Sequence, residues 1–145
     1  MTHNEILAYA AGIIDGEGSI KIWESKMNPK LRGQFNLRVN VTSTDKCLID
    51  WLAQKFGGSS SEMRSPSRTK FVKRKLGYIW ECSRPNILTF LEGIYPYLVI
   101  KKDRCKIAIE FRKTFAKRER NLSIETREIR SKICMQMSHF NSRGS

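Results

Sequence analysis

The segment EILAYAAGIIDGEGSIKI, residues 5–22, changes character in its middle and sets the order of the elements around it. Its first half is rich in alanine, glycine and isoleucine, as expected of a packed helix. From Gly18 onward apolar and polar residues alternate, which is typical of a strand. Two acids, Asp15 and Glu17, lie between the two halves, at a helix end where carboxylates are electrostatically unfavourable. Either these acids only form a turn, or a cation lies beside them.

The acidic turn is a candidate metal site. We expect Asn4 or Thr2 to cap the helix, the helix to end near Asp15, and Gly16 to take the left-handed C′ position. Across such a break Asp15 and Glu17 can approach one point, with a glycine carbonyl close by. Hard oxygen donors of this kind suit Mg²⁺, although DGEG on its own is most often a simple surface turn.

The rest of the chain repeats the same order of elements. QFNLRVNV, residues 34–41, alternates strictly and pairs with the strand that begins at Gly18. Thr44 is expected to cap a second helix, and a second hairpin joins residues 59–64 to 70–83. Helical patterns follow from Pro85, after YPYLVIKK (residues 95–102) and over about 124–140. These features predict one α+β domain over residues 1–145, with an αββαββα core over about 4–118, a four-stranded antiparallel sheet, and C-terminal helices.

The composition indicates a polyanionic partner. The chain has 27 Lys and Arg against 14 Asp and Glu, a net charge of +13 and a pI near 9.9. Such an excess favours nucleic acid, and nothing in the sequence calls for a small-molecule cofactor. No apolar run is long enough to span a bilayer, so we expect no membrane partner. The four cysteines are far apart, as is typical of reduced thiols in an intracellular protein.

The polar face of the sheet carries side chains that can read DNA bases. Arginine, asparagine and glutamine alternate with core residues there, and a two-stranded ribbon fits the major groove. A basic second hairpin would add phosphate contacts. The DNA-binding residues expected from this pattern are Ser19, Lys21, Trp23, Gln34, Asn36, Arg38, Asn40, Arg64, Arg68, Lys70, Lys73 and Lys75.

The first helix carries small residues that indicate self-association. Ala8, Ala11 and Gly12 form a stripe that permits close contact between two helices, and the sequence holds only one such helix. A second copy of the chain is therefore the expected partner. Two helices that cross on a two-fold axis would bring two Glu17 carboxylates together.

The segment YAAGIIDGEGSI, residues 9–20, resembles the LAGLIDADG motif of homing endonucleases, with residues 11–18 matching position by position. The similarity extends from about Asn4 to Phe115. A single motif resembles the homodimeric members, which cut both strands of a long, nearly palindromic double-stranded DNA site at an intron or intein insertion point. The resemblance implies Mg²⁺ as cofactor, with Mn²⁺ as a substitute, and a prokaryotic cytoplasm or an organelle as the location.

The resemblance also implies roles for individual residues. Glu17 and the Gly16 carbonyl would bind the metal, and Asp15 would lie at the base of the paired helices, near the cleavage site and within the dimer interface. PYLVIKK resembles the segment that carries the active-site lysine, which makes Lys101 the match. Ser43 stands where close relatives often have a water-ordering glutamine, and its hydroxyl could order water in place of that side chain.

Two alternative functions are compatible with the same fold but do not involve cleavage. One is an RNA-binding intron maturase, and another is a DNA-binding regulator that does not cleave. The sequence has only two histidines, His3 and His139, both near the ends, which excludes histidine-based nuclease centres. It has no P-loop motif.

Overall fold

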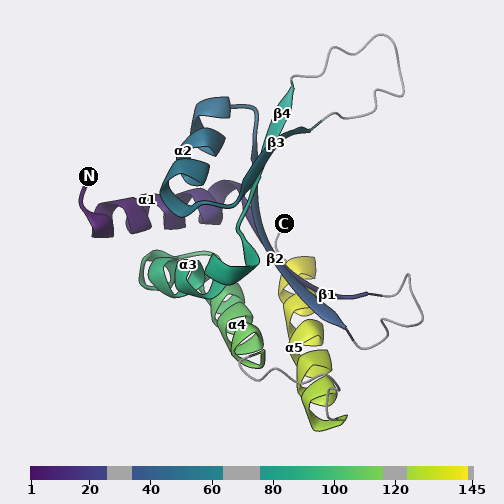
Figure 1. The fold of residues 1–145 in the computed structure, drawn as a ribbon. Coiled ribbons are helices and arrows are strands. Elements are labelled where there is room, and N and C mark those ends of the chain that lie inside the picture. Colours follow the sequence, from purple (N-terminus) through teal and green to yellow (C-terminus); the bar gives the residue numbers. More distant parts are fainter. Residues whose placement is uncertain (26–33, 64–75, 116–123, 144–145) are drawn as a thin grey trace, which may run out of the picture.

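The computed structural model describes residues 1–25, 34–63, 76–115 and 124–143 (Figure 1). The elements run in the predicted order, with short 3₁₀ turns at Arg84–Asn86 and Tyr95–Tyr97: α1 (His3–Glu17), β1 (Gly18–Glu24), β2 (Phe35–Ser43), α2 (Lys46–Phe56), β3 (Ser59–Met63), β4 (Gly77–Glu81), α3 (Ile87–Ile94), α4 (Lys102–Lys113) and α5 (Ile124–Arg143). The predicted α+β class and αββαββα order are therefore confirmed.

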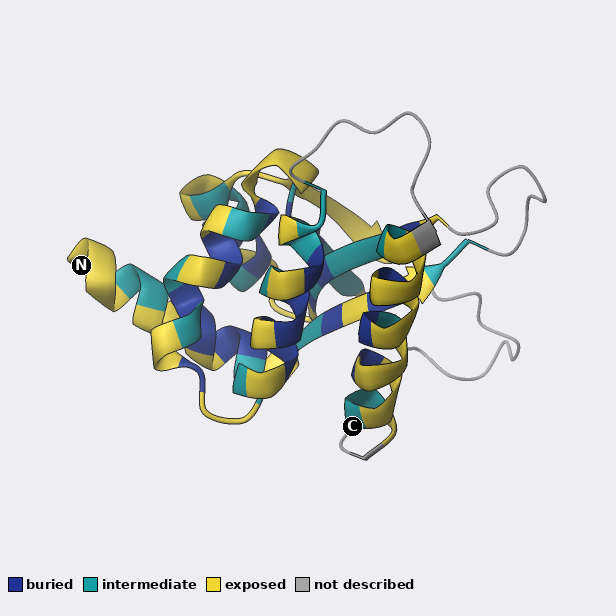
Figure 2. Ribbon diagram, turned by 90° about the horizontal axis from the view of Figure 1, so that it is seen from below, coloured by how far each residue is buried: buried dark blue, intermediate teal, exposed yellow. Residues whose placement is uncertain are grey.

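The four strands form one antiparallel sheet in the order β1-β2-β4-β3. The helices gather on one side of this sheet, and α1 runs into it at the point where β1 begins (Figure 1). Alternation along β2 explains the arrangement, because Val39 and Val41 are fully buried on the helix side while Asn40 between them faces away. Buried stretches accordingly lie where the helices meet the sheet (Figure 2).

Helix starts follow from local capping. Thr2 accepts a hydrogen bond from the Glu5 N–H, and the Glu5 carboxylate accepts one from the Thr2 N–H, which makes a complete capping box for α1. The prediction that Thr44 caps α2 is wrong. Asp45 is the N-cap, and its Oδ1 accepts from the Cys47 N–H at 3.1 Å. The start shifts by one residue because the Ser43 hydroxyl already holds the Asp45 N–H in a turn.

Helix α5 is held by two buried arginines that bind backbone carbonyls of the helix opposite. Arg130, on α5, donates to Thr114 O at the end of α4 and lies 3.8 Å from the centre of the Phe115 ring. Arg104, on α4, donates to Phe140 O on α5 at 2.9 Å. Each cation therefore lies near the C-terminal end of the partner helix, where backbone carbonyls lack intrahelical donors.

Several predicted features lie outside the described residues. These are the basic residues of the second hairpin, Arg64, Arg68, Lys70, Lys73 and Lys75. Among the described residues, no helix is both long enough and apolar enough to cross a membrane.

Candidate active site and nucleic-acid interface

Helix α1 does not break at Gly16. It continues through Glu17, and Gly18 then adopts extended backbone with φ −85° and ψ 162°. A Cβ at Gly18 would lie 2.7 Å from Ile14 Cα, so this position needs glycine for close approach. The predictions of a helix end near Asp15 and a left-handed Gly16 are therefore wrong. Because the helix is continuous, Asp15 and Glu17 point in different directions and do not meet at one point.

Asp15 is bound to the chain segment before α4. Its two carboxylate oxygens accept hydrogen bonds from the N–H groups of Val99, at 2.8 Å, and Lys101, at 2.9 Å. Lys101 is the N-cap of α4, so this carboxylate lies beside the positive end of that helix. An acid that is unfavourable at the end of α1 is thus favourable at the start of α4.

The ammonium of Lys101 lies at the C-terminal end of α1. It donates to Ile14 O at 2.8 Å, to Asp15 O at 3.1 Å and to Gly18 O at 2.7 Å. Desolvation lowers the pKa of Lys101, Arg104 lowers it further, and Asp15 and Glu17 act in the opposite direction. A cation beside the acids was one of the two explanations that the sequence left open. The ammonium of Lys101 is such a cation, and it belongs to the protein itself.

Glu17 is exposed at the last position of α1, and Gly16 before it is exposed as well. One chain offers one carboxylate and one carbonyl here, and no group of three acidic, histidine or cysteine side chains able to hold a metal occurs among the described residues. Mg²⁺ commonly takes only one or two protein carboxylates and completes its shell with water and substrate phosphate. The donors present fit such an open site, which a single chain leaves incomplete.

Ser43 lies at the end of β2, where its hydroxyl accepts the Asp45 N–H at 3.0 Å. This contact belongs to the turn before α2. Its predicted role in ordering water stays a prediction.

One face of α1 is open to solvent and lined by small residues. Ala8 and Gly12 are exposed, and a Cβ added at Gly12 would meet nothing within 4 Å. Ala11, predicted on the same stripe, is fully buried against the chain's own core. The exposed small residues are instead Ala8, Gly12 and Gly16, spaced by four.

Two apolar side chains lie exposed close to this helix. Val99 is 83% exposed and Ile100 is 72% exposed, and the hydrogen bonds to Asp15 tie their segment to the end of α1. Sequence reasoning missed them, because an apolar run after YPY is more often a buried strand.

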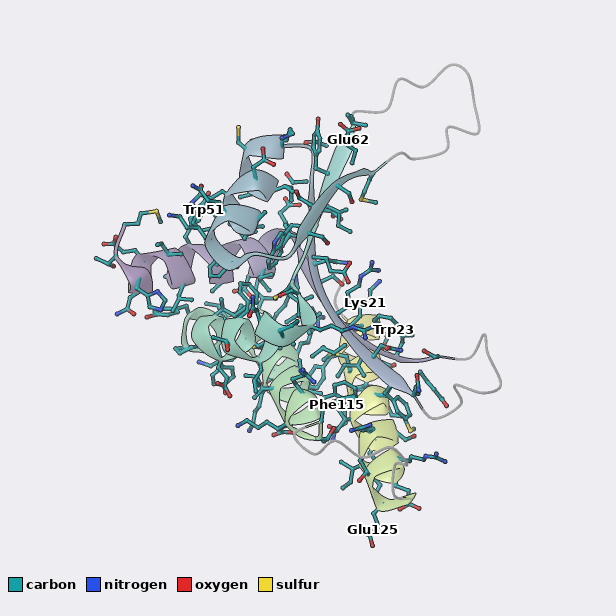
Figure 3. The ribbon with its side chains drawn as sticks, in the orientation of Figure 1. Lys21, Trp23, Trp51, Glu62, Phe115 and Glu125 are labelled. Atoms are coloured by element: carbon teal, nitrogen blue, oxygen red, sulfur yellow. The ribbon has the colours of Figure 1, made fainter. Side chains whose placement is uncertain are left out.

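The outer face of the sheet carries the predicted polar side chains. Cross-strand neighbours on β1 and β2 pair Ser19 with Asn40, Lys21 with Arg38, and Trp23 with Asn36. Figure 3 shows Lys21 and Trp23 beside β1 and β2, on the other side of the sheet from Trp51 of α2. Gln34 is exposed just before β2.

Some side chains on this face are already engaged. Asn36 donates to the Ser25 hydroxyl at 2.7 Å, and Arg38 forms an ion pair with Glu81 of β4. Glu81 is an acid that the sequence reasoning missed. It could have been noticed only by pairing β4 with β2, since the two strands are far apart along the chain.

The sequence matches no family model and no curated protein. The structure, however, is similar to the archaeal intron-encoded homing endonuclease I-Vdi141I complexed with DNA. The TM-score is 0.77 and the identity 15%, over 99% of this chain and 89% of that chain. The homing endonuclease I-CvuI in complex with its target gives a TM-score of 0.72 at 14% identity, over 99% of this chain and 85% of that chain.

A third similar structure is the LAGLIDADG homing endonuclease I-GzeII in complex with a DNA target. Its TM-score is 0.62 at 16% identity, over 96% of this chain and 44% of that chain. The chain therefore has the fold of these LAGLIDADG homing endonucleases, as the motif at residues 11–18 predicted.

Proposed function

We propose that the protein is a site-specific DNA endonuclease that acts as a homodimer and cleaves both strands of a long, nearly palindromic site with Mg²⁺. The observation that carries this proposal is the end of α1. An exposed acid, Glu17, ends a helix that exposes the small residues Ala8, Gly12 and Gly16, directly beside the polar face of the sheet.

The sheet binds the duplex. Strand β2 has nine residues, which at about 3.3 Å per residue extend for about 30 Å, close to one turn of DNA. Its outward residues can donate and accept hydrogen bonds with base edges, and the net charge of +13 favours phosphate contact. One chain then covers half of the site, and a second copy covers the other half.

Two copies meet through α1. The stripe of Ala8, Gly12 and Gly16 lets the backbones of two helices approach closely. Exposed Val99 and Ile100 supply apolar area next to it, which a single chain leaves in water. This arrangement brings the two Glu17 carboxylates near the axis that relates the chains.

The groups gathered at the end of α1 have separate roles in cleavage. Glu17 and the Gly16 carbonyl would hold the metal, which would supply activation of water and charge stabilisation for the leaving oxygen at phosphorus. Asp15 fixes the segment of Val99 and Lys101 against α1 through its two hydrogen bonds. The charge of Lys101 lies among three carbonyls at this helix end, where it favours approach of a phosphate group.

The test uses a duplex selected by the protein from a randomised library. Wild-type protein should bind it as a dimer by light scattering and should break both strands in Mg²⁺ or Mn²⁺ but not in EDTA. Binding with no cleavage in either metal would instead support a DNA-binding regulator. A stronger preference for RNA over duplex DNA would support the maturase.

A further inference from the structure

Glu81 is an acid in the middle of the face that meets DNA in the proposed function. In the sheet register Glu81 lies directly opposite Asn40 on β2 and Ser59 on β3. Arg38 lies diagonally across from it, and Lys21 lies directly opposite Arg38. An acid in the centre of this face repels phosphate, so it needs an explanation if the face binds nucleic acid.

Glu81 holds Arg38 from one side only. Arg38 Nη2 donates to Glu81 Oε2 at 3.1 Å, and Nε lies 3.1 Å from Oε1 without the direction of a hydrogen bond. The carboxylate therefore faces the Nε–Nη2 edge of the planar guanidinium. The other edge, formed by Nη1 and the second Nη2 hydrogen, points away from Glu81.

The free edge is the one that reads guanine. Arginine recognises guanine by two parallel hydrogen bonds to O6 and N7, which require a fixed, correctly aimed fork. The Arg38 side chain is 42% exposed on the outer face of the sheet. A guanidinium held in place from the other side loses less conformational freedom when it binds.

We propose that Glu81 is a positioning residue that sets base specificity in two ways. It aims Arg38 at a guanine, and its negative charge weakens binding to DNA wherever Arg38 gains no guanine contact. The proposal rests on the proposed DNA-binding function. Arg38 touches the base, and Glu81 acts through it. At non-cognate DNA the carboxylate repels the backbone without gaining the guanine contact, which lowers affinity for wrong sequences.

The test compares base preferences by sequencing the duplexes that each variant retains from a library randomised over about two turns of DNA. Arg38→Lys keeps the positive charge but cannot make the two parallel hydrogen bonds. The position at which this variant loses its preference for guanine is therefore the one that Arg38 reads. Glu81→Gln should relax the preference at that same position by about tenfold and raise affinity for the unselected library. A surface ion pair contributes little to stability, so this variant should fold.

Glu62→Gln is the matched control. Glu62 lies on β3, next to β4, on the opposite face of the sheet, and its replacement changes the net charge equally. Its base preferences should equal those of the wild type. The inference is overturned if Glu81→Gln retains the wild-type preference, or if Glu62→Gln loses it as well. If wild-type protein fails to bind any duplex, the proposed function itself has failed.

Discussion

The ammonium of Lys101 supplies the positive charge that the C-terminal end of α1 lacks in its own sequence. The last turn of α1 contains no basic residue, and most of its terminal carbonyls have no backbone donor within the helix. Ile14 O and Asp15 O of this turn, together with Gly18 O at the start of β1, accept hydrogen bonds from the one cation. Lys101 therefore joins the start of α4 to the end of α1, which fixes the position of the adjacent Glu17.

Replacement of Lys101 tests this structural role. Lys101→Met should lower the free energy of unfolding by about 1–3 kcal/mol, because three carbonyls lose their donor. Urea unfolding followed by circular dichroism measures the change. Lys106→Met, at an exposed position of α4, is the control and should alter stability little. Equal effects of the two replacements would contradict the anchoring role.

The cysteines should differ sharply in reactivity. Burial raises the pKa of Cys82 and of Cys105 from 9.0 to about 12, while Cys47 is exposed. At pH 8 the buried thiols are almost wholly protonated, and only the thiolate reacts. A thiol reagent should modify Cys47 quickly and the two buried thiols only after unfolding. Cys47→Ser should remove the fast phase, and rapid labelling of Cys82 or Cys105 in folded protein would count against this core.

Helix α1 shows a limit of prediction from sequence patterns. The small residues at 8, 11 and 12 were recognised, but their spacing does not tell which of them face the core. Ala11 is buried because the helix turns it toward the chain's own core, and Gly12 is open. The helix also continues through Gly16 because Lys101 and Asp15, which are far apart in sequence, stabilise its end.

Larger side chains at Gly12 should affect folding and self-association differently. Gly12→Ala should stabilise the single chain by up to about 1 kcal/mol, because alanine is the better helix former and no neighbour obstructs its methyl group. Gly12→Leu should keep the helical circular dichroism signal but abolish dimers in sedimentation velocity. Gln54→Leu, which exposes leucine on α2, should leave the assembly unchanged. A Gly12→Leu variant that still dimerises would exclude α1 as the interface.

The attachment of α5 depends on Arg130. This side chain is 4% exposed, and its guanidinium donates to both the hydroxyl and the carbonyl of Thr114. Arg130→Met should lower the free energy of unfolding by about 1–3 kcal/mol, since these partners lose their donor. It should also make α5 more sensitive to proteolysis. The exposed Lys132→Met is the control, and unchanged proteolysis of Arg130→Met would argue that apolar contacts alone hold the helix.

For the whole molecule, the sequence predicted the element order and the outward polar residues well. Both depend on local periodicity, such as the strict alternation of residues 34–41. The contact between Asp15 and the segment before α4, and the ion pair of Arg38 with Glu81, could not be predicted. They join residues 84 and 43 positions apart, and only the strand register and the packing of α4 bring them together.

The central claim is that Glu17 gives a DNA-binding dimer its cutting activity. The direct measurement compares wild type and Glu17→Gln on the same selected duplex in Mg²⁺, with binding and strand scission followed in parallel. Glu17 is exposed, so the variant should fold and bind like wild type while cleavage of both strands is lost. Cleavage at the wild-type rate by Glu17→Gln would contradict the account.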